Sequence, residues 1–247
     1  MIKVALVTGA AQGLGFVVSD ALVNDGFNVV MTDVDFEQVE AAARKLDPDL
    51  TSVLPLKLDV LHKSDFESAL QTTVEHFGAC QVLVNNAALT PTTPLMDITP
   101  EEFTQVLDVN LRGCFLGSQV FGQHFADQKF GRIINFSSLA GQMGGTASGA
   151  HYASSKAGIV TLTKIFARQF ADQGVTVNAI APGPVDVPSV RDKVPADKLQ
   201  HIIENMIPVK AMSDPEFIAS MVLMLTSEKA NTVTGATWDA NGGIYMR

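Results

Sequence analysis

Short apolar runs alternate with longer amphipathic stretches from one end of the chain to the other. The runs are almost continuous in hydrophobic residues, which is typical of parallel strands that are covered on both faces. Between the runs, apolar residues recur every three or four positions, as in Phe36, Val39, Ala43 and Leu46, and this spacing predicts helices. The predicted strands cover residues 2–8, 27–32, 52–58, 81–85, 131–136, 175–181 and 235–240.

This alternation predicts an α/β fold. Strand and helix units of this length favour right-handed crossovers, and therefore a doubly wound parallel sheet of the Rossmann type with helices on both faces. Because no linker or repeat interrupts the pattern, residues 1–247 are expected to form a single domain. Ligands of such sheets bind beyond the carboxyl ends of the strands, so functional residues are expected in the turns that follow each strand.

Composition and charge narrow the range of partners. Hydrophobic residues make up 47% of the chain, charged residues 17%, and the formal net charge is −9. This acidic balance disfavours nucleic acids, anionic membranes and other acidic partners. No apolar run approaches the ~20 residues that span a bilayer, and no signal-peptide pattern is visible, so we expect a cytoplasmic protein. Cys80 and Cys114 lack metal-ligand spacing, so we expect buried thiols and no metal site.

A glycine-rich turn follows the first predicted strand. Thr8 closes the strand, and the sequence T-G-A-A-Q-G-L-G leads from it into the first helix. Glycines permit a tight turn and let the backbone approach a pyrophosphate, whose charge the helix N-terminus stabilises. An ordinary βα turn would look similar, but the position after the first strand favours dinucleotide binding. The residues expected at the dinucleotide here are Gly9, Gln12, Gly13, Leu14 and Gly15.

Asp33 ends the second predicted strand, about 20 residues beyond the glycine turn, where an acid accepts hydrogen bonds from the adenosine ribose. A carboxylate there would repel the 2′-phosphate of NADP. No cation stands in the turn, which reads Ala10-Ala11-Gln12, or directly after the strand, which continues with Val34 and Asp35. The sequence therefore favours NAD over NADP. Asp33 is also a candidate N-cap for the following helix, and the two roles are compatible.

Tyr152 and Lys156 stand four residues apart, which makes them neighbours on one face of a predicted helix. A free phenol has a pKa of about 10, and a nearby ammonium and a nicotinium charge would lower it. Tyr152 could then act as a base towards an alcohol or an acid towards a ketone. Taken alone, the pair could equally be a half-buried aromatic residue and an exposed helix cation.

The other motifs occur around this pair in a definite order. N-N-A-A (Asn85–Ala88), Asn110 and I-I-N-F-S-S (Ile133–Ser138) precede it, and Pro182-Gly183 follows it. Together with the glycine turn, these elements resemble the short-chain dehydrogenase/reductase family over essentially the whole chain. The resemblance implies hydride transfer to and from the pro-S face of the nicotinamide, with a catalytic set formed by Asn110, Ser138, Tyr152 and Lys156.

The resemblance also implies individual roles. Lys156 would contact the nicotinamide ribose, Ser138 would donate a hydrogen bond to the substrate oxygen, and Asn110 would hold a water that links Lys156 to solvent. Two positions depart from the family pattern, because Ala88 replaces the usual glycine and Val187 replaces a common threonine. Further cofactor contacts are implied at Asp59 and Val60 beside the adenine, at Asn86, Ala87 and Ala88, and at Pro182, Gly183 and the backbone of Val185 beside the nicotinamide.

The substrate side is expected in a loop and helix over about 184–212. The predicted pocket is compact and largely apolar, without a clear carboxylate clamp, which suits a small to medium secondary alcohol or ketone, aliphatic or aromatic. Plain packing would explain its methionines equally well. The residues proposed for its wall are Thr90, Gln142, Met143, Gly144, His151 and Met206.

Within the family, the segments F-G-R-I-I-N-F-S-S and V-T-G-A-T-W-D-A-N-G-G-I-Y-M are similar to bacterial 3-oxoacyl-acyl-carrier-protein reductases. Those reductases usually take NADPH and present cations to an acidic carrier protein. Asp33 and the acidic charge instead favour an NAD-linked secondary alcohol dehydrogenase and disfavour an acyl carrier protein as partner. The carrier-protein reductase remains an alternative, as does a non-catalytic dinucleotide sensor. The helices near 101–128 and 151–172 carry more apolar residues than one face needs, which favours subunit interfaces and indicates a homotetramer. The apolar residues assigned to these interfaces are Leu107, Leu111, Phe115, Phe121 and Phe125 on the first helix and Ile159, Leu162, Ile165 and Phe166 on the second.

Overall fold

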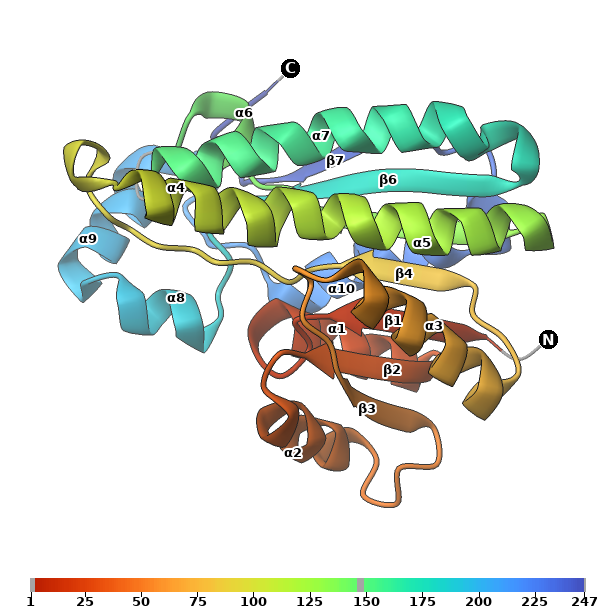
Figure 1. Ribbon diagram of the computed structural model, residues 1–247. Helices are drawn as coiled ribbons and strands as arrows, with labels where there is room; N and C mark the ends of the chain where they lie inside the picture. The colour runs from red at the N-terminus through yellow and green to blue at the C-terminus, as the bar shows by residue number, and fades with distance from the viewer. Residues whose placement is uncertain (1–2, 146–148, 247) are drawn as a thin grey trace.

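The computed structural model describes residues 3–145 and 149–246. Its centre is one parallel sheet with the strand order β3-β2-β1-β4-β5-β6-β7 (Figure 1). The predicted fold class is therefore confirmed, and the strands differ from their predicted bounds by only one or two residues at most ends. The strands are β1 (Val4–Thr8), β2 (Asn28–Asp33), β3 (Val53–Lys57), β4 (Val82–Asn85), β5 (Gly131–Phe136), β6 (Val175–Pro182) and β7 (Thr237–Ala240).

Helices cover both faces of the sheet. One face carries α1 (Gly13–Asn24), α2 (Phe36–Leu46) and α10 (Pro215–Thr226), and the other carries α3 (Lys63–Phe77), α5 (Gly113–Gln128) and α7 (Ala150–Phe170). Figure 1 shows α5 and α7 lying along the sheet side by side. The shorter helices are α4 (Pro100–Leu107), α6 (Ala140–Met143), α8 (Pro188–Lys193), α9 (Ala196–His201), the 3₁₀ turns η1 (Leu95–Asp97), η3 (Ala171–Gln173) and η5 (Glu228–Ala230), and the π-turns η2 (Asp108–Arg112) and η4 (Ile202–Met206).

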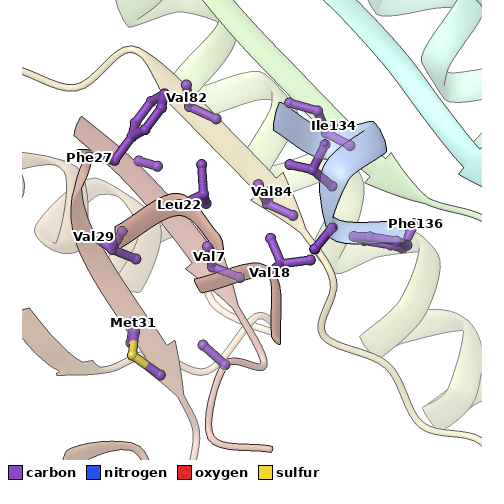
Figure 2. Close-up of a cluster of buried hydrophobic side chains, with 14 of the residues drawn as sticks. Val7, Val18, Leu22, Phe27, Val29, Met31, Val82, Val84, Ile134 and Phe136 are labelled. Carbon is purple, nitrogen blue, oxygen red and sulfur yellow. The ribbon is translucent and has the colours of Figure 1, made fainter. Parts of the chain in front are cut away.

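The core on the α1 side shows why the strands read as continuous apolar runs. Val7 of β1, Met31 of β2 and Val84 of β4 point from the sheet towards Val18 and Leu22 of α1, and all five are fully buried (Figure 2). The alternate residues of the same strands face the other helix layer, so both faces of each strand are apolar. Removing these side chains from water is the main stabilising contribution to the sheet.

The order of the strands determines where a ligand can bind. From β1 the chain adds β2 and β3 on one side, and from β4 it adds β5, β6 and β7 on the other. The connections therefore diverge at the carboxyl ends of β1 and β4, which leaves a crevice at this switch point. The glycine turn follows β1, and the N-N-A-A segment follows β4, so both lie at this crevice.

The burial of α5 and α7 corrects part of the sequence analysis. Phe121 and Phe125 of α5, and Ile159 and Phe166 of α7, are buried within the subunit, because both helices pack on the sheet and on each other. These residues cannot be evidence of a subunit interface. Phe115 and Ile165 remain exposed to 37% and 54%, so an interface on this face would depend on such residues instead.

Candidate active site

The turn after β1 has a shape that only glycine allows. Gly9 has a φ of +65°, and a Cβ atom on it would lie 2.7 Å from the Cα of Ala87, while Gly13 has a φ of +58°. The Asn86 amide donates hydrogen bonds of 2.9 Å to the carbonyls of Thr8 and Gly9. The end of β4 thus holds the turn in place, and the backbone is free to approach a pyrophosphate closely.

A cleft of about 610 Å³ runs from this turn to the helix that carries Tyr152. Of the predicted dinucleotide contacts, Gly15 does not line it, because Gly15 packs beneath the turn against Gly9 and Asn86. The other predicted residues do line it: Gly9, Gln12, Gly13, Leu14, Asp33, Asp59, Val60, Asn86, Ala87, Ala88, Tyr152, Lys156, Pro182, Gly183 and Val185. The size, the glycine cradle and these side chains fit an extended dinucleotide.

Asp33 lies at the adenosine end of the cleft. Its carboxylate accepts hydrogen bonds of 3.3 Å from the backbone N–H groups of Ala11 and Asp35. The N-cap of α2 is Asp35, whose side chain accepts a hydrogen bond from the N–H of Gln38, so the capping role considered for Asp33 is wrong. Among the described residues that line the cleft, Lys156 is the one cation, and it lies at the opposite end.

Lys156 is a buried cation at the Tyr152 end of the cleft. Its ammonium donates a 2.7 Å hydrogen bond to the Phe136 carbonyl and lies 5.6 Å from the centre of the Tyr152 ring. Burial lowers the pKa of Lys156 from its ordinary value of 10.5 to about 8, and interaction with Cys114 opposes this effect. The group is therefore able to change protonation state near neutral pH.

Tyr152 departs from the sequence-based expectation. Burial raises the pKa of its phenol, and the hydrogen bond with Ser138 opposes this increase only in part. A lowered pKa was expected from the nearby ammonium together with the nicotinium charge, but in the protein without the cofactor desolvation of the phenolate is the larger effect. Positive charge on an oxidised nicotinamide is what would act in the opposite direction. Ser138 and Tyr152 thus form one hydrogen-bonded pair at the end of the cleft.

Asn110 lies in the π-turn η2 between α4 and α5, a local irregularity that often marks a functional position. Its side-chain oxygen accepts a 2.7 Å hydrogen bond from the Leu89 N–H, and its amide donates to the Leu89 carbonyl and to Ser155. Asn110 is buried and does not line the cleft. It connects the segment after β4 to α7 at Ser155, the residue directly before Lys156.

A second cavity of about 300 Å³ adjoins the cleft and shares Ser138 and Tyr152 with it. Of the predicted pocket residues, Thr90, Met143 and Met206 lie on its wall. Apolar side chains predominate in the rest of the lining, among them Leu139, Val190, Val194, Leu199, Ile202 and Ile244. Such a surface fits an aliphatic or aromatic group attached to the reacting carbon.

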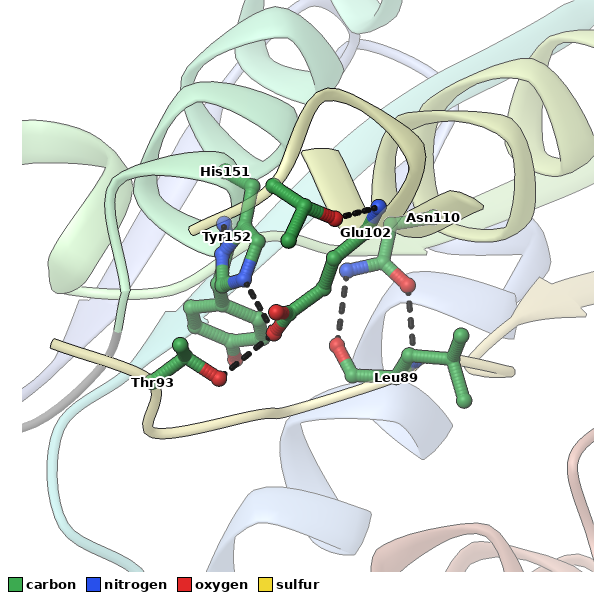
Figure 3. Close-up of polar contacts among 7 residues, drawn as sticks. Leu89, Thr93, Glu102, Asn110, His151 and Tyr152 are labelled. Carbon is green, nitrogen blue, oxygen red and sulfur yellow. Dashed lines mark hydrogen bonds and ion pairs between the residues drawn. The ribbon is translucent and has the colours of Figure 1, made fainter. Parts of the chain in front are cut away.

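The other three predicted pocket residues lie elsewhere. Gln142 donates its amide hydrogen to Asp239, and Gly144 is the left-handed residue that ends α6. The His151 side chain is fully buried, does not line the cavity, and has its ring turned to Glu102 (Figure 3). Glu102 was not among the predicted site residues. The sequence analysis also missed Ile244 as a wall residue, because nothing near the C-terminus indicates that it returns to the pocket.

Among the described residues, every helix is too short or too polar to span a membrane. In residues 3–145 and 149–246, no three His, Cys, Asp or Glu side chains gather as metal ligands would.

The dinucleotide cleft and the Ser138, Tyr152 and Lys156 set define an oxidoreductase of the α/β type. A family model described as enoyl-(acyl carrier protein) reductase matches residues 9–245, and the chain belongs to the short-chain dehydrogenase/reductase family. It is accordingly an oxidoreductase that acts on a CH–OH group and binds a nicotinamide dinucleotide, so the alternative of a non-catalytic sensor is set aside.

Curated relatives match the chain over nearly its full length. The chain is 35% identical over 247 residues to 3-oxoacyl-[acyl-carrier-protein] reductase FabG of Staphylococcus epidermidis, with 100% of both chains covered. Proteins of the same name from Vibrio cholerae and Thermotoga maritima are 35% and 31% identical over 244 residues, which cover 99% of this chain and 98% of each relative. These names favour the reductase alternative of the sequence analysis over its main interpretation.

Proposed function

We propose that the chain is an NADH-linked reductase of 3-oxoacyl thioesters. The observation that carries the proposal is the meeting of Ser138 and Tyr152 with both the dinucleotide cleft and an apolar cavity. A ketone at this junction would lie beside the nicotinamide, with its acyl chain in the cavity. The full-length similarity to reductases of 3-oxoacyl carrier-protein substrates supports this choice of ketone.

In this proposal the side chains have different roles at the substrate carbonyl. Ser138 and Tyr152 hold the substrate oxygen by hydrogen bonds, which stabilise the negative charge that develops on it. The bound nicotinamide supplies the hydride, and Tyr152 delivers a proton to the oxygen. Lys156 holds the nicotinamide ribose and, with a pKa of about 8, is able to restore a proton to the phenol. Asn110 keeps the segment after β4 against α7 while this occurs.

The preference for NADH is supported by Asp33. Its carboxylate lines the end of the cleft at which we propose that the adenosine ribose binds, and the described lining there contains no Lys or Arg to neutralise a 2′-phosphate. The relatives' names do not specify a cofactor, so NAD rather than NADP stays part of the proposal. Val187 lines the cleft in place of a threonine, and a Val185 backbone contact is proposed to hold the carboxamide.

The expectation about the carrier of the thioester has to be revised. The comparisons do not support the expectation that an acyl carrier protein is an unlikely partner, because the relatives are named for carrier-protein substrates. At the substrate segment, however, Arg191 is already paired with Asp186 by hydrogen bonds of 2.6 and 2.7 Å. We therefore include both an acyl carrier protein and coenzyme A as carriers. A cytoplasmic location is part of the same proposal.

A small secondary alcohol or its ketone is the second candidate substrate. The apolar cavity of about 300 Å³ supports it, because a compact ketone fills such a space without a thioester. The acidic protein and the Asp186–Arg191 pair also favour a substrate without an acidic carrier.

One substrate panel separates these possibilities. NADH consumption is followed with a 3-oxoacyl carrier protein, the same acyl group on coenzyme A, and simple aliphatic and aromatic ketones, and the series is repeated with NADPH. The proposal expects the highest kcat/KM for a thioester with NADH. Turnover of simple ketones alone would replace it with the second candidate.

A further inference from the structure

Glu102 joins three segments of the chain beside the catalytic tyrosine. One of its carboxylate oxygens accepts hydrogen bonds from the Thr93 hydroxyl, at 2.6 Å, and from Nε2 of His151, at 3.0 Å (Figure 3). Glu102 is on α4, Thr93 is in the segment after β4, and His151 is in the first turn of α7. These contacts hold the pKa of Glu102 below its usual range, so the group is a carboxylate at neutral pH.

The partners of His151 define the roles of its two ring nitrogens. Its Nδ1 atom is 2.8 Å from the backbone nitrogen of Tyr152, whose N–H can only donate, so Nδ1 accepts. A carboxylate can only accept, so Nε2 donates to Glu102. Each ring nitrogen therefore has one assigned role. The His151 side chain is fully buried, and this fixes the orientation of the ring.

This arrangement does for α7 what a capping residue does elsewhere. The first N–H groups of a helix have no partner within the helix, and the N-cap residue here is Gly149, which has no side chain to accept them. His151 supplies the missing acceptor for the N–H of Tyr152. The backbone of the catalytic tyrosine is thus held by a side chain that Glu102 orients.

The same carboxylate also fixes the wall of the substrate cavity. Thr90 and Thr92 line that cavity, and they lie between Leu89, which Asn110 holds, and Thr93, which Glu102 holds. The cavity wall is therefore held at both ends by residues that also contact α7, the helix that carries Tyr152 and Lys156. Glu102 and Asn110 are in different elements and act on this segment from different sides.

We propose that Glu102 and His151 form a positioning pair, which holds the Tyr152 backbone and the Thr90–Thr92 wall at the distance that hydride and proton transfer require. Neither residue lines the cleft or the cavity, so neither is expected to touch cofactor or substrate. The inference rests on the role of Tyr152 in the proposed reaction, but not on which ketone is the substrate. Small displacements of reacting groups lower rates steeply, on the order of 100-fold for 1 Å.

The main test compares Glu102→Ala with Glu101→Ala. Both carboxylates lie in the first turn of α4, so both substitutions change the charge at the helix N-terminus equally, but Glu101 is exposed and has no part in the cluster. We expect Glu102→Ala to lower kcat at least about tenfold, and Glu101→Ala to leave it within about twofold. Glu102→Gln keeps an acceptor oxygen and is expected to restore most of the rate.

An isotope effect distinguishes positioning from a loss of folded protein. With NADH deuterated at the transferred hydrogen, Glu102→Ala is expected to show a larger isotope effect on kcat than the wild type, because chemistry becomes slower relative to product release. A smaller folded fraction would lower kcat and leave the isotope effect unchanged. An unchanged isotope effect, or equal losses in the Ala and Gln variants, would overturn the proposal.

Hydrogen exchange provides a test that needs no substrate. Peptides from the first turn of α7 are expected to exchange about tenfold faster in Glu102→Ala than in Glu101→Ala, with α5 unchanged. Equal exchange would overturn the positioning pair even if the enzyme reduced no thioester. If Glu102→Ala does not fold, Thr93→Val decides the kinetic test, because it removes a single hydroxyl from the cluster.

Discussion

The buried ammonium of Lys156 gives the most quantitative test of the site. Its pKa is lowered from 10.5 to about 8, so at neutral pH the folded protein holds a charge that burial disfavours. One pKa unit corresponds to about 1.4 kcal/mol, so this charge costs about 3 kcal/mol of folding free energy below pH 8. Replacing the residue by methionine removes the charge, the activity and the hydrogen bond to the Phe136 carbonyl.

The sign of the pH dependence follows from the two protonation states. Below pH 8 the lysine is charged in both the folded and the unfolded chain, so the full cost is present. Between pH 8 and 10.5 the folded protein loses the proton while the unfolded chain keeps it, and stability rises with pH. Relative to Lys156→Met, the wild type should therefore gain about 2–3 kcal/mol between pH 7 and pH 10.

Thermal denaturation measures this gain. For a chain of this size, 1 kcal/mol changes Tm by about 2–4 °C, so the Tm difference between wild type and variant should change by about 6 °C across the series. The hydrogen bond that Lys156→Met lacks changes the Tm difference by the same amount at every pH, so it does not alter the trend with pH. Lys164→Met, on an exposed position of α7, should give a curve parallel to the wild type. Parallel curves for Lys156→Met would refute the reasoning.

Three further predictions concern the cofactor, the phenol and the assembly. Tyr152→Phe should lower kcat at least about 100-fold while the Kd for NADH stays within about twofold, by fluorescence titration, because the phenol moves a proton and does not hold the dinucleotide. The wild type should prefer NADH over NADPH in kcat/KM by about tenfold or more. Asp33→Ser should reduce that preference, because it removes the carboxylate that would repel the 2′-phosphate of NADPH. Equal kcat/KM values for the two cofactors in the wild type would show that Asp33 does not select the cofactor. Light scattering should report a mass near four times the 26.3 kDa chain, and aspartate at Phe115 and Ile165 should lower it; a stable wild-type monomer would contradict the predicted interfaces.

The parts of the site that could be predicted depend on local sequence. The glycine turn, the end of β2 and the Tyr152–Lys156 spacing are each set by a few consecutive residues, and each has a distinct backbone or chemical requirement. The central strands could be located for the same reason, since both faces of β1, β2 and β4 are apolar. Such local patterns predict the structure correctly because the local conformational preferences of these segments agree with the overall fold.

The parts that could not be predicted depend on contacts between distant segments. His151 is 49 residues from Glu102 in the sequence, and a lone histidine gives no signal of where its ring points. In the protein without a cofactor, burial raises the pKa of Tyr152, and this desolvation depends on the packing of the whole site, which the sequence does not show. The assignment of Phe121 and Phe125 to a subunit interface was wrong for a similar reason, since the sheet and α7 had already buried them.

The transfer of a labelled hydride tests the central claim most directly. The wild type is incubated with a 3-oxoacyl thioester and NADH that carries deuterium at the pro-S position of the nicotinamide. Mass spectrometry of the product then locates the label. We expect deuterium at the C3 carbon, no label in the product when the deuterium is pro-R, and almost no product from Tyr152→Phe. Label retained in the oxidised cofactor, or transferred from the pro-R position, would contradict the assignment of this site.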